Sequence, residues 1–131
     1  MNENKAYTIR MVVAESDIDA MGHVNNVVYL RYVQEAAAAH WQAVATEAAK
    51  AAMLWVVLRH EIDYLAPAFA GEVLYATTWV GETTGVKSVR FVEIANATGK
   101  TIAKARTVWC MLDAATLKPK RIEPEMMEPF M

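Results

Sequence analysis

The stretch NVVYLRYVQEAAAAHWQAV, residues 26–44, decides the fold that this sequence predicts. Five residues recur along it at intervals of three or four positions, namely Tyr29, Val33, Ala36, His40 and Val44. Because an α-helix makes one turn in about 3.6 residues, this spacing forms one stripe and predicts a helix over 26–44. The run EAAAAHW adds very small side chains, so a sheet can pack close to the helix backbone. The alanine content then permits a short second segment up to Ala52, with Thr46 as its cap.

Strand patterns flank the predicted helix on both sides. Before it, AYTIRMVVAE (6–15) has the length and β-branched content of a strand. After it, four segments have strand patterns separated by turn residues, namely LWVVLRHEIDY (54–64), VLYATTWVGE (73–82), VKSVRFVEIA (86–95) and TIAKARTVWCMLD (101–113). In the first of these, Leu58, His60, Ile62 and Tyr64 alternate with charged residues, which predicts one mostly apolar face. The short turns between consecutive strands predict an antiparallel meander.

These elements predict a single α+β domain over residues 1–131, in which a bent antiparallel sheet wraps the long central helix. A chain of 131 residues is the size of one ordinary domain. The tail KPKRIEPEMMEPF (118–130) is predicted to hold one short helical turn that lies across the surface. With 55% hydrophobic and 21% charged residues, the chain is globular, and we expect an oligomer interface to cover part of its apolar surface.

Several classes of protein are disfavoured by the same sequence. No basic segment followed by an apolar run opens the chain, and no stretch is long enough to span a bilayer, so we expect a cytoplasmic protein. The single cysteine, Cys110, is expected to be a buried thiol in a reducing compartment. A formal net charge of -2 argues against nucleic-acid binding, which requires a basic surface.

Basic residues nevertheless dominate the stretch from Thr84 to Arg121, where the only acidic residues are Glu93 and Asp113. They are Lys87, Arg90, Lys100, Lys104, Arg106, Lys118, Lys120 and Arg121. Two interpretations of this stretch are open: a solvated strand face, which charge alone favours slightly, or a site for a phosphate-bearing small molecule.

The segment DIDAMGHVNN, residues 17–26, gathers polar groups directly before the predicted helix. It offers the carboxylates of Asp17 and Asp19, a flexible Gly22, the imidazole of His23 and two amides. The first N–H groups of a helix lack internal partners and can hold an oxygen that becomes negative. A carboxylate in the preceding loop can act as nucleophile or as general base on water, and the two together suit acyl transfer or hydrolysis. The alternative is that these residues only cap the helix and form its turn.

The longer segment DIDAMGHVNNVVYLRYVQEA, residues 17–36, resembles the signature of the hotdog-fold acyl thioesterases. The 4-hydroxybenzoyl-CoA thioesterase-like group and the plant acyl-ACP thioesterases share a pattern of the form D-x-D-x-x-x-H-V-N-N-x-x-Y that runs into a central helix. The matching residues are Asp17, Asp19, His23, Val24, Asn25, Asn26 and Tyr29, with Glu35 placed as in the acyl-ACP branch. Weaker likeness extends through HEIDYLAPAFAGEVLYATTWV and GVKSVRFVEI, and the resemblance implies the architecture given above.

The resemblance also implies roles for the residues of the motif. Asp19 matches the catalytic carboxylate, whereas Asp17 matches the aspartate that more often shapes the loop. The thioester oxygen would be held by backbone N–H groups from Gly22 to Val24. His23 matches a histidine that is catalytic in the acyl-ACP branch, or it only positions substrate or water. That branch also has an asparagine where this chain has Met21, which weakens the expectation of a plant-type mechanism.

The same likeness suggests substrate contacts. Asn25, Asn26 and Tyr29 are predicted to border the substrate, with helix capping as the alternative for the two asparagines. The segment GVKS is similar to the place where related enzymes meet the phosphates of their cofactor. Lys87, Ser88 and Arg90 are therefore predicted to contact coenzyme A, whose negative charges Lys and Arg can pair.

Other chemistry has weaker signals. Glu35 is either part of a buried ion pair or a second acid, and His40 and His60 are expected to be hydrogen-bonded core histidines. No metal-ligand spacing such as His-x-x-x-His occurs, and no G-x-G-x-x-G loop is present. Ser16 and Ser88 are the only serines and neither lies in G-x-S-x-G, which disfavours a serine hydrolase.

The resulting hypothesis is an acyl-CoA thioesterase that needs no metal and no cofactor, because coenzyme A is part of its substrate. An acyl-ACP thioesterase is the first alternative. A non-catalytic hotdog domain that holds an acyl ligand is the second. The resemblance further implies a homodimer or a homotetramer, formed by pairing of sheet edges. The acyl group itself is not predicted.

Overall fold

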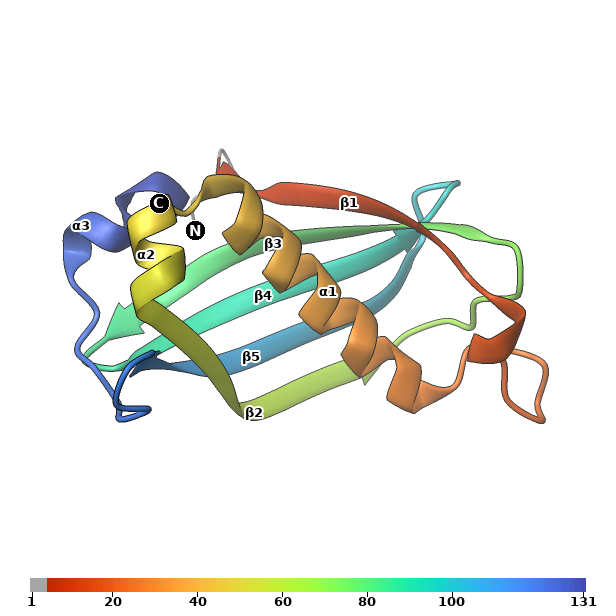
Figure 1. The fold of residues 1–131 in the computed structure, drawn as a ribbon. Coiled ribbons are helices and arrows are strands. Elements are labelled where there is room, and N and C mark those ends of the chain that lie inside the picture. Colours follow the sequence, from red (N-terminus) through yellow and green to blue (C-terminus); the bar gives the residue numbers. More distant parts are fainter. Residues whose placement is uncertain (1–4) are drawn as a thin grey trace.

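A five-stranded antiparallel sheet curves around one long helix in the computed structural model, which describes residues 5–131 (Figure 1). The strands are β1 (Tyr7–Val12), β2 (Met53–Tyr64), β3 (Val73–Thr84), β4 (Lys87–Asn96) and β5 (Thr101–Asp113). The helices are α1 (Asn26–Val44), α2 (Glu47–Ala52) and α3 (Pro124–Met127), with 3₁₀ turns at Glu15–Asp17 and Glu128–Phe130. The predicted α+β architecture is confirmed, and residues 1–4 of the predicted domain lie outside the described part. None of the described helices is long and apolar enough to cross a membrane.

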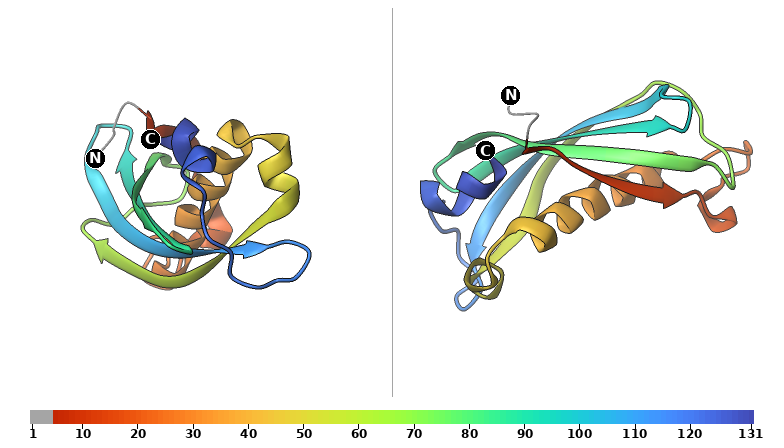
Figure 2. Two further views of the ribbon diagram at one scale, coloured as in Figure 1. Left: turned by 90° about the vertical axis from the view of Figure 1, so that its left-hand side faces the viewer. Right: turned by 90° about the horizontal axis from the view of Figure 1, so that it is seen from above.

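Helix α1 begins and ends at the residues that the apolar periodicity predicts. Its cap is Asn25, whose Oδ1 accepts the N–H of Val27 at 3.0 Å. The second cap is also confirmed, because Thr46 Oγ1 accepts the N–H of Ala49 at 3.1 Å where α2 begins. The predicted stripe faces the sheet. Four of its residues are buried, namely Tyr29, Val33, Ala36 and His40, and Val44 is partly buried. The sheet curls around α1 when the molecule is seen end-on (Figure 2).

The strand order is β1-β3-β4-β5-β2, which corrects the predicted meander. Strands β3, β4 and β5 pair consecutively as expected, but β2 pairs with β5 and not with β3. The connection of residues 65–72 carries the chain from one edge of the sheet towards the other, so β1 and β2 form opposite edges (Figure 1). A local pattern specifies that a strand forms, whereas its partner is set by long-range packing.

A β-bulge interrupts β2 and corrects the predicted alternation along it. The register with β5 shifts between Val57 and Arg59, so Leu58 is 52% exposed rather than directed at the core. His60 and Ile62 are partly buried, as the alternation predicts. Tyr64 is exposed, but its ring lies 5.6 Å from that of Tyr29.

The C-terminal tail closes one end of the core, which corrects its predicted place across the surface. Its helical turn forms as expected, but Ile122, Met127 and Phe130 are buried. Phe130 is 1% exposed, stacks on Trp41 with ring centroids 5.7 Å apart, and meets His40 edge-on at 4.9 Å. The tail therefore contributes to the core as α1 does, because its proline-rich turn presents apolar side chains on one side.

Two other predictions of buried residues are confirmed. Cys110 is a buried free thiol on β5. His40 is a hydrogen-bonded core histidine: its Nδ1 lies 2.8 Å from Arg90 Nη1, and its ring stacks on Tyr7. Since the guanidinium can only donate, the neutral imidazole accepts through Nδ1. Burial, and then the nearby charge of Arg90, lower the pKa of His40 to about 4.

This depressed pKa predicts a loss of stability in mild acid. An unfolded chain binds a proton at His40 below its ordinary pKa of 6.5, whereas the folded chain does so only near 4. Stability is therefore present above pH 6.5 and is lost as the pH falls towards 4, by about 3 kcal/mol in total. The free energy of unfolding is measured by urea denaturation at pH 7 and at pH 4. Between these two values, it should decrease by about 3 kcal/mol more for the natural chain than for His40→Gln. Parallel pH profiles for the two proteins would contradict the assignment.

Candidate active site

Asp17 ties the loop before α1 to the helix. Its buried carboxylate accepts hydrogen bonds from Arg31 Nη2 at 2.9 Å and from the Tyr32 hydroxyl at 2.7 Å, with the Ala14 N–H at 3.4 Å. Burial opposes its charged form, but the hydrogen bonds from Tyr32 and Arg31 outweigh this and hold the pKa of Asp17 below its ordinary value. The residue occupies the loop-shaping position that the resemblance implies.

The same loop is closed at its base, below a short tip. The Asn25 N–H donates to the Asp17 carbonyl at 3.0 Å, and Ile18 pairs with Val24 as an isolated β-bridge. Figure 1 places this loop, together with the N-terminus of α1, at the end of the molecule opposite α2 and α3. The base holds the tip, residues 19–23, directly before the first turn of the helix.

The tip is a tight turn that carries Asp19. The Asp19 N–H donates to the His23 carbonyl at 3.0 Å, and Gly22 has the positive φ of +87° that this reversal requires. Asp19 Oδ1 accepts the Met21 N–H at 2.8 Å. Its Oδ2 accepts no hydrogen bond from residues 5–131, so one carboxylate oxygen is fixed and the other is available.

Two of the three N–H groups that were predicted to hold the thioester oxygen are engaged in hydrogen bonds within the fold. The Gly22 N–H donates to the Asp19 carbonyl at 3.0 Å, and the Val24 N–H donates to Ala68 at 2.9 Å. The His23 N–H has no partner within the described residues. Of the three predicted donors, only the His23 N–H is not engaged in a hydrogen bond within the described residues.

A hollow of about 300 Å³ opens beside the N-terminus of α1. It is lined by residues of the loop, of the helix and of the chain that leaves β2, namely His23, Val24, Asn26, Tyr29, Tyr64, Leu65, Ala66 and Pro67. Four predicted site residues, namely His23, Val24, Asn26 and Tyr29, thus lie together around one space. Asp19 is in the adjoining tip and is not among the lining residues. Asn25 acts as the helix cap, its predicted alternative.

Tyr29 lines this hollow and carries a buried hydroxyl. The residue is 3% exposed, and its hydroxyl faces the Ala68 backbone without a hydrogen bond of good geometry. Burial, followed by the charge of Glu72, raises the pKa of Tyr29 to about 12. The phenol therefore stays protonated at neutral pH and is a donor without an acceptor among residues 5–131.

The residues predicted to contact coenzyme A do not form one site. Lys87 is exposed, whereas Ser88 and Arg90 are buried. Neighbouring residues of a strand point to opposite faces, so Lys87 cannot share a face of β4 with Ser88. Ser88 bonds to Thr83 at 2.8 Å, and Arg90 bonds to Thr78 at 3.1 Å as well as to His40. Of the three, only Lys87 is placed on the surface.

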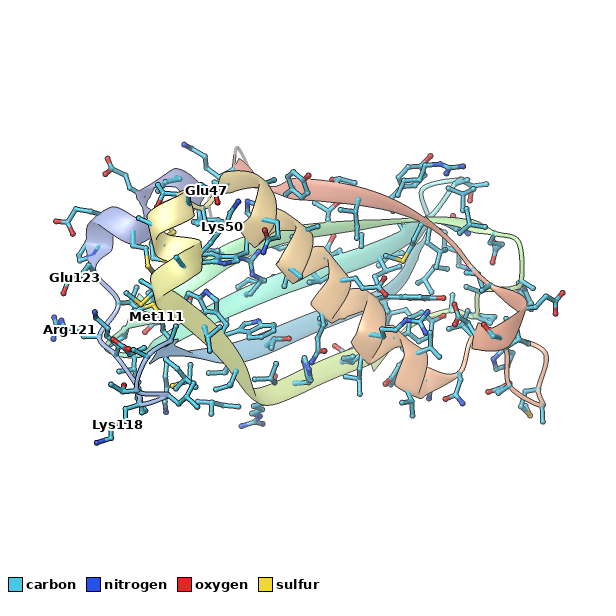
Figure 3. The ribbon with its side chains drawn as sticks, in the orientation of Figure 1. Glu47, Lys50, Met111, Lys118, Arg121 and Glu123 are labelled. Carbon is cyan, nitrogen blue, oxygen red and sulfur yellow. The ribbon has the colours of Figure 1, made fainter. Side chains whose placement is uncertain are left out.

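The basic stretch from Thr84 to Arg121 is similarly divided. Lys104 and Arg106 on β5 lie 3.9 and 4.0 Å from the carboxylates of Glu93 and Glu61, as on a solvated strand face. Figure 3 shows Lys118 and Arg121 at the end of the molecule where α3 lies, away from the Asp19 loop. Within one chain, the basic residues are therefore not gathered beside the hollow.

Two further candidates have structural partners. Glu35 is paired with Arg31 at 3.2 Å, and both side chains are about half exposed, which corrects the predicted burial of this pair. His60 Nδ1 lies 2.8 Å from Thr107 Oγ1, and burial lowers the pKa of His60. Both residues are accounted for by contacts within the fold.

Sequence reasoning missed Tyr32 and Tyr64. Tyr32 lies three residues after Tyr29 on the same side of α1, a spacing that could have suggested its contact with the loop. Tyr64 donates to the Asn26 carbonyl at 3.2 Å, and only the path of β2 brings it there. No cluster of three or more His, Cys, Asp or Glu side chains in residues 5–131 could hold a metal ion.

Comparison with known proteins extends this description. Residues 13–130 match the model of a protein family described as the thioesterase-like superfamily. No match is found among curated proteins. The fold is similar to that of a 1,4-dihydroxy-2-naphthoyl-CoA thioesterase from Synechocystis, with a TM-score of 0.81 and 18% identity over 95% of each chain.

Two further structures show the same fold. A DHNA-CoA thioesterase from Staphylococcus aureus gives a TM-score of 0.83 and 20% identity, covering 95% of this chain and 88% of that one. An acyl-ACP thioesterase from Bacteroides thetaiotaomicron gives 0.81 and 25% identity, covering 93% of this chain and 51% of that one. The similar fold thus makes up nearly the whole chain of the two CoA thioesterases and about half of the acyl-ACP thioesterase.

Proposed function

Because the chain belongs to the thioesterase-like superfamily and is therefore a thioester hydrolase, we propose that its substrates are acyl-CoA thioesters and that Asp19 performs the chemistry. The observation that carries this proposal is the arrangement at the N-terminus of α1. The Asp19 carboxylate with one available oxygen, the unpartnered His23 N–H and the hollow all lie around the same turn.

In the proposed reaction, the thioester carbonyl lies against the His23 N–H. Asp19 Oδ2 either attacks the carbonyl carbon, giving an anhydride that water then hydrolyses, or takes a proton from a water that attacks the same carbon. The carbonyl oxygen becomes negative as the new bond forms, and the His23 N–H, helped by the positive end of the helix dipole, stabilises it. In the first route the carbon–sulfur bond breaks as the anhydride forms, and the departing thiolate takes a proton from solvent. In the second route Asp19 passes the proton that it took from water to the leaving sulfur. Both routes release coenzyme A as the thiol and the acyl group as the acid, and both leave Asp19 as a free carboxylate.

The Tyr29 hydroxyl and the Asn26 side chain are proposed to border the acyl group or the pantetheine arm in the hollow. A protonated phenol without a protein acceptor supports this position for Tyr29, because a substrate oxygen would satisfy it. The exposed Lys87 is retained only as a candidate contact of the phosphates of coenzyme A, without Ser88 and Arg90.

The proposal is tested by thiol release from a panel of acyl-CoA substrates with short, long and aromatic groups. Similarity to an acyl-ACP thioesterase favours one alternative, so the same acyl chain is supplied on coenzyme A and on acyl carrier protein. A higher kcat/KM with coenzyme A supports the proposal, and a strong preference for the carrier protein would replace it. Tight acyl-CoA binding without turnover of any chain length would favour the non-catalytic alternative.

We further propose that the chain works as a homodimer paired along β2. This strand is an edge of the sheet, and its outer residues Leu54, Val56 and Leu58 are exposed. A long apolar edge strand left unpaired is prone to associate. We expect light scattering to give at least twice the chain mass of 14.6 kDa at micromolar concentration, or four times in a homotetramer. The mass of a single chain would contradict this.

A further inference from the structure

A second cavity, of about 290 Å³, lies between the C-terminal half of α1 and the sheet. Its walls are mainly apolar and aromatic, and they include Trp41 from α1, Trp55 from β2 and Trp109 from β5. The rings of Trp41 and Trp55 meet edge-to-face with centroids 5.7 Å apart. Such a mixture of aromatic walls with a few polar groups is typical of small-molecule sites.

The floor of this cavity holds a buried cation. Arg90 lines the cavity and is 8% exposed, and its guanidinium donates through Nη1 to His40 and Thr78. Both partners are neutral acceptors, since His40 is uncharged at neutral pH. No carboxylate within residues 5–131 forms an ion pair with Arg90. Burying a charge without a counter-charge is costly, so this guanidinium is a strong site for an anion.

The cavity has further hydrogen-bond donors besides Arg90, and no acidic side chain lines it. Trp109 Nε1 is buried and has no hydrogen-bond partner in the described residues. Lys50 also lines the cavity, with its side chain 19% exposed and its Nζ 3.0 Å from the exposed Glu47. Figure 3 shows Lys50 on α2, next to the C-terminal half of α1. No Asp or Glu lines the cavity, so its polar character is that of a receptor for negative charge.

We propose that this cavity binds the carboxylate of a small acid with an aromatic or aliphatic body, with Arg90 pairing the carboxylate and the tryptophans enclosing the body. The guanidinium presents the planar fork that a carboxylate matches in two hydrogen bonds. Trp109 lines the same cavity, and in this proposal its unpartnered indole N–H is a further donor. Ser88 is already bonded to Thr83 and takes no part in this recognition.

The carboxylate site is separate from the Asp19 turn within one chain. Ala38, which lines the cavity, lies 12 residues after Asn26, so the rise of the helix places it about 18 Å from the N-terminus of α1. Two sources of the same chemistry fit this distance. One is a free acid that binds independently of turnover, and the other is the far carboxylate of a long-chain dicarboxylic acyl group that reaches from the Asp19 turn to Arg90.

Calorimetric titration of the full chain with benzoate and with its neutral analogue benzamide tests the charge recognition directly. We expect benzoate to bind the natural chain at least about tenfold more tightly, because only benzoate supplies the missing negative charge. Arg90→Met should lower benzoate affinity at least about tenfold and leave benzamide within about twofold. Arg106→Met, which removes a half-exposed arginine of β5, is the matched control and should bind like the natural chain. Trp109→Phe removes the indole N–H together with part of the ring, so lost packing affects both ligands. It should weaken benzoate about threefold more than benzamide, which tests the site if Arg90→Met does not fold.

The proposal is overturned if benzoate binds no more tightly than benzamide, if neither binds at about 10 mM, or if Arg106→Met loses as much affinity as Arg90→Met. These titrations need no turnover, so their failure is distinct from failure of the proposed hydrolysis. A kinetic arm, which rests on that hydrolysis, separates the two sources. A loss of kcat/KM in Arg90→Met for hexadecanedioyl-CoA but not for palmitoyl-CoA identifies the acyl carboxylate. Benzoate binding with unchanged kinetics for both substrates identifies a free acid, and each result supports the site.

Discussion

Asp19→Asn is expected to lower kcat for thioester hydrolysis by a hundredfold to ten-thousandfold, the contribution of a positioned general base, or by more if the carboxylate is a nucleophile. Asparagine keeps the oxygen that accepts the Met21 N–H, so the turn at residues 19–23 is retained. The loss would then report the missing carboxylate rather than a changed loop. Thiol release from the best acyl-CoA substrate measures the effect, with circular dichroism as the check on folding.

The matched control for this substitution is Asp113→Asn. Asp113 also accepts backbone N–H groups in a turn, from Ala115 and Thr116, but it lies at the end of β5 away from the Asp19 loop. The same change of charge and shape is therefore made at the opposite end of the molecule. We expect kcat within about twofold of the natural chain there. Unchanged kcat in Asp19→Asn would remove Asp19 from the mechanism.

Phe130→Ala is expected to cost about 3–5 kcal/mol of unfolding free energy, the range for truncating a buried phenylalanine. The ring is almost fully buried and contacts both Trp41 and His40, so its loss leaves a cavity between the tail and α1. Urea unfolding followed by circular dichroism measures the change. Phe69, which is 48% exposed, provides the matched control, and Phe69→Ala should cost under about 1 kcal/mol. Equal losses in the two variants would contradict the burial of the tail.

The local elements could be predicted from the sequence because their causes are local. The stripe from Tyr29 to Val44 marks α1 since one helical face must be buried, and Asn25 and Thr46 mark caps since a helix start has unpaired N–H groups. The place of β2 beside β5 could not be predicted, because pairing across the sheet depends on contacts distant in sequence. The bulge at Leu58 shifts the alternation by one residue, which no local pattern marks.

The sequence predicts which residues surround the candidate site, but it predicts their arrangement in space less well. The motif identifies the residues around the Asp19 turn, but it does not say which N–H groups are already hydrogen-bonded in the fold. Here the Gly22 N–H bonds within the turn, and the Val24 N–H bonds to Ala68, a residue distant in sequence. For Arg90 a signal was present: it lies two residues after Ser88 and three after Lys87, so strand alternation separates it from Lys87. If Lys87 faces solvent, the same alternation predicts that Ser88 and Arg90 lie on the buried face of β4.

Because the base of the Asp19 loop is closed, the tip at residues 19–23 is structurally independent of the rest of the domain. Asp17, the Ile18–Val24 bridge and the Asn25 N–H fasten both ends of the tip to α1. The tip itself reaches into solvent, where Met21 is 77% exposed. Variation in its length or side chains therefore stays uncoupled from folding, as in a compact surface loop with fastened ends. Evolution or engineering can alter what this turn recognises without altering how the domain folds.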